Sequence, residues 1–186
     1  MKRIILMLTS ALLCVLVASC TGKPDNVTPV TKFSAPRYLG TWYEIARLDH
    51  RFERGLSSVS ATYSMREDGA IKVLNRGYNA EKKQWKDAEG KASFVGAPDV
   101  GYLKVSFFGP FYGSYIVFDI DDAYTHSMIS GPDTSYLWIL SRTPTMDEPT
   151  KKRLVAKAQA LGFDTSKLIY VTHEQSPQQQ QQQPSR

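Results

Sequence analysis

The chain has 186 residues, of which 42% are hydrophobic and 22% are charged, and its formal net charge is +5. This length is enough for one folded domain that buries about two-thirds of the surface of its chain. The mild positive charge gives no reason to expect a nucleic-acid-binding protein.

The N-terminus begins with a positive segment followed by an uncharged apolar run. Lys2 and Arg3 precede the run 4–17, which is too short for a transmembrane helix of ~20 residues. A charged start, a short apolar stretch and small residues before a break are typical of a secretory signal peptide, here residues 1–19. Val17-Ala18-Ser19-Cys20 also resembles the lipobox of bacterial lipoproteins. The resemblance implies cleavage before Cys20 and acylation of that residue, whereas the alternative is an ordinary signal peptide.

Processing of this kind would decide the fate of both cysteines. Cys14 would be removed and Cys20 lipidated, so none would be left for a disulfide, a zinc site or a thiol nucleophile. Two or more acyl chains give stable anchoring without a membrane span. The next residue is Thr21, whereas an Asp at that position usually retains Gram-negative lipoproteins in the inner membrane. The lipobox resemblance therefore implies an outer-membrane protein that faces the periplasm, with a mature net charge of +3 once Lys2 and Arg3 leave 21 basic against 18 acidic residues.

A polar segment and a series of strand patterns follow. Residues 20–32 contain two prolines after the cysteine and are predicted to form the lipidated N-terminus and its tether. Eight short strand patterns then succeed one another with turn signals between them, and Gly90 interrupts the fourth. They lie at 41–47, 57–65, 71–77, 85–96, 102–108, 115–120, 125–130 and 136–142. Succession without long crossovers favours an all-β fold, an eight-stranded antiparallel up-and-down β-barrel, over two packed sheets.

One helix and a low-complexity tail complete the chain. Thr145 and Glu148 have the spacing of a capping box, and Leu154, Ala158 and Leu161 recur at helical spacing. Gly162 should end this helix. Its apolar stripe is narrow, so the helix should pack outside the barrel. A short strand is predicted at 167–172, and the Gln-rich residues 174–186 should be disordered.

Three short motifs resemble the signature elements of the lipocalin family. They are Gly40-Thr41-Trp42 at the start of the first strand, Asp121 after the sixth, and Arg142 at the end of the eighth. The second signature differs, because Thr-Asp-Tyr is usual and Ile120-Asp121-Asp122 stands here. The stretches "YLGTWYEIARLDHRFERG" and "VSFFGPFYGSY" are more similar still to the bacterial outer-membrane lipoprotein lipocalins. The resemblance covers residues 33–173 and implies a lipocalin domain over that range.

A barrel of eight strands holds one small ligand when one of its ends is closed. Trp42 should plug the closed end, with Arg142 over the face of its ring and Gly40 allowing the tight turn beneath it. The charged segment 49–54 should form a loop at the open rim. It is either a solvated loop or a lid that meets polar head groups.

Strand alternation, aligned so that Trp42 points inward, predicts the walls of a ligand pocket. The candidate ligand-binding residues are Glu44, Ala61, Tyr63, Val73, Asn75, Val105, Phe107, Tyr115, Tyr136 and Trp138. Ala46 and Met65 fall on the same face by this rule. Ala46, Ala61 and Ala92 are small and would leave room for a ligand. The alternative is that the inward residues fill a dry core.

The polar groups suggest the class of ligand. Arg142 is the only basic residue that alternation places inward, and a bare fatty acid would need a cation for its carboxylate. A lysophospholipid or a similar amphiphile could instead keep its phosphate at the rim, near His50, Arg51 or Arg54. Its acyl chain would then lie along the apolar wall. Lysophospholipid or fatty-acid storage or transport in the cell envelope is therefore the predicted function.

Other functions find less support. The chain has no G-x-S-x-G and no H-E-x-x-H motif, so we expect no enzyme, no catalytic residue, no metal ligand and no cofactor. Binding of haem or another hydrophobic small molecule would fit such a pocket, but no histidine is predicted to point inward. A structural or docking lipoprotein with a packed barrel is a further alternative. It would use Phe108, Phe111 and Tyr112, which could form a homodimer contact, a membrane contact or a wall of the pocket mouth.

Overall fold

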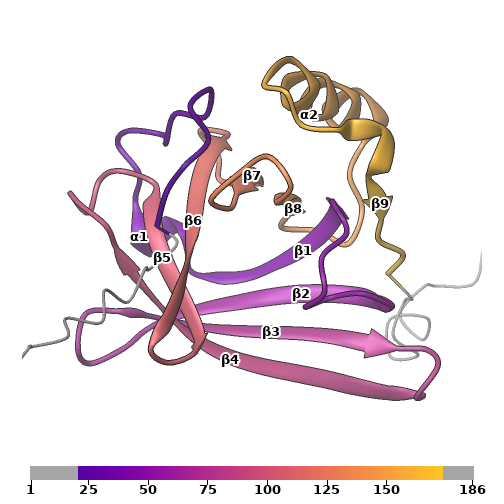
Figure 1. Cartoon of the computed structure of the whole chain (residues 1–186), viewed down its shortest axis with the longest axis horizontal. Coiled ribbons are helices and arrows are strands. Elements are labelled where there is room, and N and C mark those ends of the chain that lie inside the picture. The colour runs from indigo at the N-terminus through magenta and orange to yellow at the C-terminus, as the bar shows by residue number, and fades with distance from the viewer. Residues whose placement is uncertain (1–20, 174–186) are drawn as a thin grey trace, which may run out of the picture.

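The computed structural model describes residues 21–173, so the predicted signal peptide, Cys20 and the Gln-rich tail lie outside the described residues. Eight antiparallel strands close into a barrel in which each strand pairs with the next and β1 pairs with both β8 and β2 (Figure 1). The predicted up-and-down barrel is thereby confirmed. The strands are β1 (Gly40–Arg47), β2 (Leu56–Met65), β3 (Ile71–Asn79), β4 (Gln84–Phe94), β5 (Tyr102–Phe108), β6 (Phe111–Ile120), β7 (His126–Ser130) and β8 (Leu137–Ser141).

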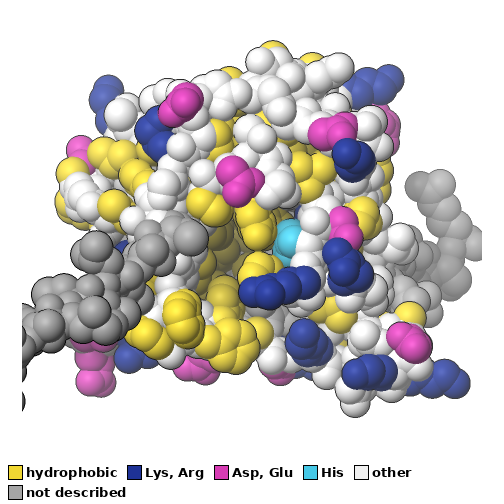
Figure 2. All heavy atoms as spheres, viewed as in Figure 1, with side chains coloured by type: hydrophobic (Ala, Val, Ile, Leu, Met, Phe, Trp, Pro, Cys, Tyr) yellow, Lys and Arg dark blue, Asp and Glu magenta, His cyan; other side chains and the backbone are white. Residues whose placement is uncertain are grey.

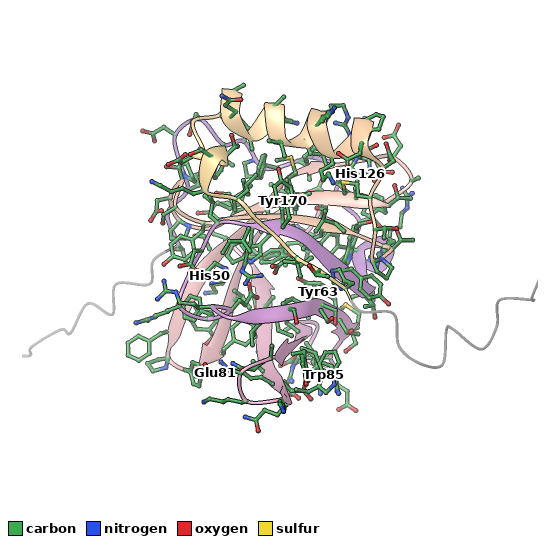
Figure 3. The ribbon with its side chains drawn as sticks, turned by 90° about the vertical axis from the view of Figure 1, so that its right-hand side faces the viewer. His50, Tyr63, Glu81, Trp85, His126 and Tyr170 are labelled. Atoms are coloured by element: carbon green, nitrogen blue, oxygen red, sulfur yellow. The ribbon has the colours of Figure 1, made fainter. Side chains whose placement is uncertain are left out.

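The up-and-down connection gives the barrel two different ends. The β1–β2, β3–β4, β5–β6 and β7–β8 connections lie at one end, which we call the mouth. The short helix α1 (Ala35–Tyr38) and the other connections lie at the opposite, closed end. In the side view of Figure 3, His50 of the β1–β2 connection and His126 at the start of β7 accordingly lie towards opposite ends of the barrel.

Gly90 does not interrupt the fourth strand, contrary to the sequence prediction. β4 runs through it and pairs with β3 from Gln84 to Ala92 without a register shift. A Cβ atom at Gly90 would lie 2.8 Å from the ring of Phe107 on the neighbouring strand. The glycine therefore makes room for an aromatic side chain inside the barrel, and the strand stays regular.

A β-bulge in β1 changes which side chains point into the barrel. Glu44 pairs with Leu140 and Ala46 with the adjacent Ile139, so β1 has one extra residue at this place. The prediction for Ala46 was wrong, because it packs in the cluster outside the barrel, while Arg47 turns inward and becomes 1% exposed. Met65, the last residue of β2, keeps the predicted face, because it pairs with the buried Ile71, but it is half exposed at the end of the strand.

Helix α2 (Glu148–Ala160) packs outside the barrel (Figure 1), as predicted. Its Leu154 and Ala158 are fully buried against the outer cluster. The predicted capping box was wrong, because Asp147 is the N-cap and its Oδ1 accepts a hydrogen bond from the Thr150 amide at 2.9 Å. The short 3₁₀ helix η1 (Thr165–Lys167) follows, and β9 (Ile169–Tyr170) then pairs with β1. Within residues 21–173, no helix combines the length and apolarity needed to cross a membrane.

The segment predicted as the tether packs against the barrel over its described part, residues 21–32. Val27 is fully buried in the outer cluster. The Val30 amide donates a hydrogen bond to the Val117 carbonyl at 2.9 Å, and the Val30 carbonyl accepts one from the Gly101 amide at 2.9 Å. The described part of the predicted tether therefore lies along the barrel wall, because two apolar residues and the backbone of this polar segment find partners there.

Candidate ligand-binding site

The closed end is built around Trp42. The indole is fully buried, and its Nε1 donates a hydrogen bond to the Tyr38 carbonyl at 2.8 Å. The Arg142 guanidinium lies 3.9 Å from the ring centroid and donates to the carbonyls of Thr41 and Arg37. Gly40 has φ +92°, and a Cβ atom there would approach Arg142 to 3.4 Å. Trp42, Arg142 and Gly40 thus take the structural places expected for them.

Asp121 joins the same end of the barrel through the β6–β7 turn. Its carboxylate accepts hydrogen bonds from the amides of Thr125 at 2.7 Å and His126 at 2.8 Å. Tyr124 lies within this turn, accepts a hydrogen bond from Arg142 through its carbonyl, and accepts another from the Ser34 amide through its hydroxyl. Asp121 therefore fixes a turn that supports Arg142.

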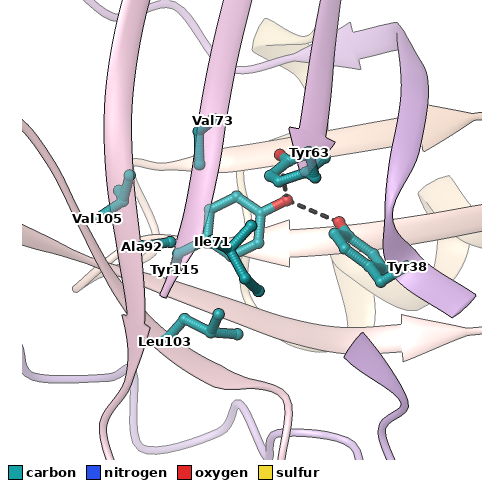
Figure 4. Close-up of a pocket in the computed structure, with 8 residues that line it drawn as sticks. All are labelled: Tyr38, Tyr63, Ile71, Val73, Ala92, Leu103, Val105 and Tyr115. Carbon is teal, nitrogen blue, oxygen red and sulfur yellow. Dashed lines mark hydrogen bonds between the residues drawn. The ribbon is translucent and has the colours of Figure 1, made fainter. Parts of the chain in front are cut away.

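Three tyrosines form a buried hydrogen-bonded group just inside the closed end. The Tyr115 hydroxyl lies 2.7 Å from the hydroxyls of both Tyr38 and Tyr63 (Figure 4). Burial raises the pKa of Tyr38 to about 12 and raises the pKa of Tyr63 and Tyr115 well above the usual value of 10.0. All three therefore stay neutral at physiological pH and present hydroxyl groups to an otherwise apolar floor.

A small pocket opens on this group. Eight residues line it in Figure 4, namely Tyr38, Tyr63, Ile71, Val73, Ala92, Leu103, Val105 and Tyr115. Its volume of about 10 Å³ matches roughly one water molecule. Towards the mouth the interior widens, and Figure 2 shows a hollow with hydrophobic walls and a histidine at its edge. The barrel is thus narrow at its floor and open above it.

Charged groups gather under the mouth, where the alternation rule predicted none but Glu44. Arg47 Nη1 donates to Glu44 Oε1 at 2.6 Å, and its Nη2 donates to the carbonyls of Glu53 and Leu56. His50 Nε2 lies 3.1 Å from Glu53 Oε2, which also accepts from Trp138 Nε1 at 3.0 Å. We call Glu44, Arg47, His50, Glu53 and Trp138 the latch cluster, because it fastens loop 48–55 to the barrel wall.

The pKa values of the two carboxyl groups of the latch cluster are shifted in opposite directions. Burial and the nearby charge of Glu53 raise the pKa of Glu44 well above 4.5, although Arg47 opposes the shift. Burial also opposes ionisation of Glu53, but His50, the Trp138 indole and Arg47 together lower its pKa. Burial thus favours the neutral form of Glu44, whereas the partners of Glu53 favour its charged form.

The remaining sequence candidates also lie in the interior. Ala61, Val105 and Phe107 pack in the inner apolar cluster with Trp138. The Asn75 Oδ1 atom is buried without a hydrogen-bond partner. Tyr136 lies at the mouth, with its ring centroid 6.1 Å from that of His50. Seven of the ten predicted residues pack in the inner apolar cluster, and the role of all ten in ligand binding stays a prediction.

Two residues at the mouth, Arg47 and His50, lie elsewhere than the sequence analysis placed them. Strict alternation from Trp42 places Arg47 outside, and only the bulge brings it in. His50 was assigned to a rim loop, but it is 6% exposed and packs 4.9 Å from the Trp138 ring. No pattern in the sequence announces either position. Within residues 21–173, no three His, Cys, Asp or Glu side chains are grouped so as to hold a metal ion.

The cations available at the rim differ from those first considered. Arg54 is engaged by Asp49 at 2.7 Å, and His50 is buried. The Arg51 guanidinium lies 5.2 Å from the centroid of the Phe52 ring, and Lys86 Nζ donates a hydrogen bond to the Phe52 carbonyl at 3.5 Å. Arg51 and Lys86 are thus better placed than Arg54 or His50 to meet an anionic group at the opening.

The sequence is similar to those of known proteins. The family model for the lipocalin-like domain matches residues 33–173. The chain is 55% identical over 172 residues to the outer membrane lipoprotein Blc of Vibrio cholerae, covering 92% of this chain and 98% of that protein. It is 53% identical over 171 residues to the protein of the same name from Escherichia coli K12, covering 91% and 97%.

Solved structures agree on the fold. Insecticyanin from the tobacco hornworm matches with a TM-score of 0.64 and 23% identity over 84% of this chain and 88% of that one. The cockroach allergen Per a 4 matches with a TM-score of 0.64 and 20% identity, covering 82% and 96%. The Blc relatives further place the chain at the outer membrane as a lipid-anchored protein. The family match, the close relatives and the barrel itself together show that this chain belongs to the lipocalin family.

Proposed function

We propose that this lipocalin, whose family binds small hydrophobic ligands, stores or carries single-chain amphiphilic lipids at the outer membrane. The ligand class is a lysophospholipid or a fatty acid. One observation carries the proposal: the hollow has hydrophobic walls and opens at the mouth, where charged side chains gather (Figure 2), whereas the buried Trp42 fills the closed end. An acyl chain removes its own apolar surface from water there, at ~0.8 kcal/mol for each buried methylene.

The charge balance favours a lysophospholipid over a bare fatty acid. Arg47 is the cation nearest the interior, but Glu44 and two backbone carbonyls already occupy its guanidinium. A carboxylate placed deep in the barrel would therefore find no free cation, and burying an unpaired charge is costly. A phosphate at the mouth would instead meet Arg51 and Lys86, which remain accessible.

Native mass spectrometry of the mature protein purified from cells tests this assignment. We expect a co-purifying lipid with a single acyl chain that is lost on denaturation. Added lysophosphatidylethanolamine should bind more tightly than palmitate. A protein that is empty and refuses both lipids would mean that the barrel is closed to ligands, and the proposal would be wrong.

Two matched substitutions locate the acyl chain. Val105→Trp adds a ring to the inner wall and should weaken lysophospholipid binding at least about tenfold, because the ring takes the volume of several methylenes. Lys72→Trp adds the same ring to the outer face of β3, where Lys72 pairs with Glu89. It should leave the affinity unchanged. Equal losses in both variants would contradict an internal site.

A second pair addresses the head group. Lys86→Gln should lower the affinity for lysophosphatidylethanolamine by up to about fivefold, the range of an exposed ion pair. Arg54→Gln is the control, because Asp49 already occupies Arg54. An affinity that is insensitive to both changes would place the head group away from this rim.

A further inference from the structure

We propose that the mouth of the barrel faces the membrane that holds the chain, and that the tip of the β5–β6 hairpin touches its lipid surface. The inference rests on acylation of Cys20, which the lipobox motif predicts, and it goes beyond lipid binding itself. We call Lys104, Phe108, Phe111 and Tyr112 the hairpin patch.

The hairpin patch has the composition of a membrane-contact surface. Phe108 is 77% exposed and Phe111 is 69% exposed, the two largest exposures among the large hydrophobic side chains of residues 21–173. Lys104 Nζ lies 5.0 Å from the Tyr112 ring on the neighbouring strand. Exposed phenylalanines next to a Tyr and a Lys suit the boundary between acyl chains and head groups, where apolar and charged parts are both accommodated.

The first described residues after the lipid anchor lie against β5 and β6, the two strands whose hairpin carries this patch. The Thr21 carbonyl accepts a hydrogen bond from the Tyr102 hydroxyl, and the Gly22 carbonyl accepts one from Ser114 Oγ at 2.5 Å. Ser114 is three residues from Phe111 along β6, which corresponds to about 10 Å in a strand. Cys20 directly precedes Thr21, and one residue adds only ~3.8 Å. The acyl chains would therefore leave the protein along β5 and β6, the strands whose hairpin carries Phe111.

A connection this short restricts orientation. A long free tether would let the barrel turn in any direction, but residues 21–32 are fastened along the wall by Val27 and Val30. Acyl chains that enter a bilayer at Thr21 bring β5 and β6 to its surface. The exposed side chains of their hairpin then lie where they lose contact with water, which favours the same orientation.

The rest of the mouth is compatible with a lipid surface. Phe52 on the opposite loop is 51% exposed. The β3–β4 hairpin contributes Lys82, Lys83 and Lys86 against Glu81, and Figure 2 shows Lys and Arg side chains on the same face as the hollow. Basic side chains near a bilayer are attracted by anionic head groups. A lipid could then pass between leaflet and barrel without crossing bulk water.

A single fluorescent label tests the orientation in the full mature lipoprotein. Phe111→Cys, labelled with NBD, is reconstituted in vesicles of phosphatidylethanolamine and phosphatidylglycerol. Glu67→Cys in the β2–β3 turn at the closed end is the matched control. We expect a blue-shifted emission at position 111 that brominated lipids quench, and a water-like, unquenched emission at position 67.

Two other outcomes of the labelling experiment would overturn the proposal. Water-like emission at both positions would overturn the proposal. A blue-shifted label at position 111 that brominated lipids fail to quench would mean that a second copy of the chain covers the patch, which also overturns it.

Lipid transfer separates this proposal from the proposed function. The variant Phe108→Ser/Phe111→Ser should still sediment with vesicles and bind lysophospholipid with unchanged affinity. Its rate of lipid uptake from vesicles should fall by at least about tenfold, because two side chains no longer enter the surface. An unchanged rate contradicts the orientation alone, whereas a wild-type protein that binds no lipid contradicts the proposed function alone.

Discussion

The two ends of the barrel stabilise themselves by different means. At the closed end, the Trp42 indole donates a hydrogen bond to the Tyr38 carbonyl, and the Arg142 guanidinium donates to the carbonyls of Thr41 and Tyr124. At the mouth, the latch cluster buries two carboxyl groups, one guanidinium and one imidazole together. Both His50 ring nitrogens and Arg47 Nε are buried without a well-formed hydrogen bond.

The two ends therefore differ in how strongly one arrangement of their side chains is favoured. Fully satisfied polar groups around a large ring favour one arrangement, whereas incompletely satisfied charges leave alternatives of similar energy. The closed end is thus the part that holds the barrel together. The mouth is the part where loop 48–55 is held by buried polar groups that are incompletely satisfied. Substitutions at three positions test this contrast.

The largest effect is expected at the closed end. Trp42→Ala removes a fully buried indole together with the surface on which Arg142 lies. We expect a loss of about 3–5 kcal/mol in the free energy of unfolding, measured by urea denaturation. Trp85→Ala is the control, because Trp85 is half exposed and should lose less than about 1 kcal/mol. Similar losses in both variants would contradict a larger contribution of the closed end to the free energy of unfolding.

A smaller loss is expected in the latch cluster. Arg47→Met leaves Glu44 and Glu53 buried without their shared cation, which should lower the free energy of unfolding by about 3 kcal/mol. The double variant Glu44→Leu/Arg47→Met removes the stranded partner as well and should recover most of that loss. Denaturation of both variants measures the difference. If the double variant were less stable than Arg47→Met, the Glu44–Arg47 ion pair would itself stabilise the fold, which contradicts the contrast between the two ends.

The smallest effect should depend on pH. The pKa of Glu44 is raised in the folded state by burial and by the charge of Glu53. Its contribution to stability is therefore complete below the unfolded value of 4.5 and is lost as pH rises through the folded pKa. Glu53, whose pKa is lowered, contributes in the opposite direction as pH falls.

The variant Glu44→Gln isolates the pH dependence that comes from Glu44, because glutamine has nearly the same shape as glutamate but does not titrate. At pH 4 to 5 we expect the variant to differ from the wild type by about 1 kcal/mol or less. With rising pH the wild type should lose stability relative to the variant. Thermal unfolding across pH 4 to 8 checks the sign. A wild type that gains on the variant as pH rises would mean that the Arg47 pair outweighs burial.

The sequence alone determined the strands, their order and the closed end. Period-two alternation and turn residues are local signals, so the eight strands and the outer helix could be located without a structure. The Gly40-Thr41-Trp42 motif and Arg142 likewise take the places expected of them. Most of the apolar wall, including Tyr63, Val73, Val105 and Tyr115, followed from the same alternation.

Tertiary structure decided the chemistry of the mouth and the position of the anchor. The bulge after Glu44 depends on how β1 pairs with β8, a contact about ninety-five residues away in the chain, and it reverses the face of Arg47 and Ala46. The burial of His50 depends on Trp138, and the docking of Val27 on a helix near the C-terminus. Pairing register and packing between distant segments leave no local pattern in a sequence, because their energy arises only when the segments meet.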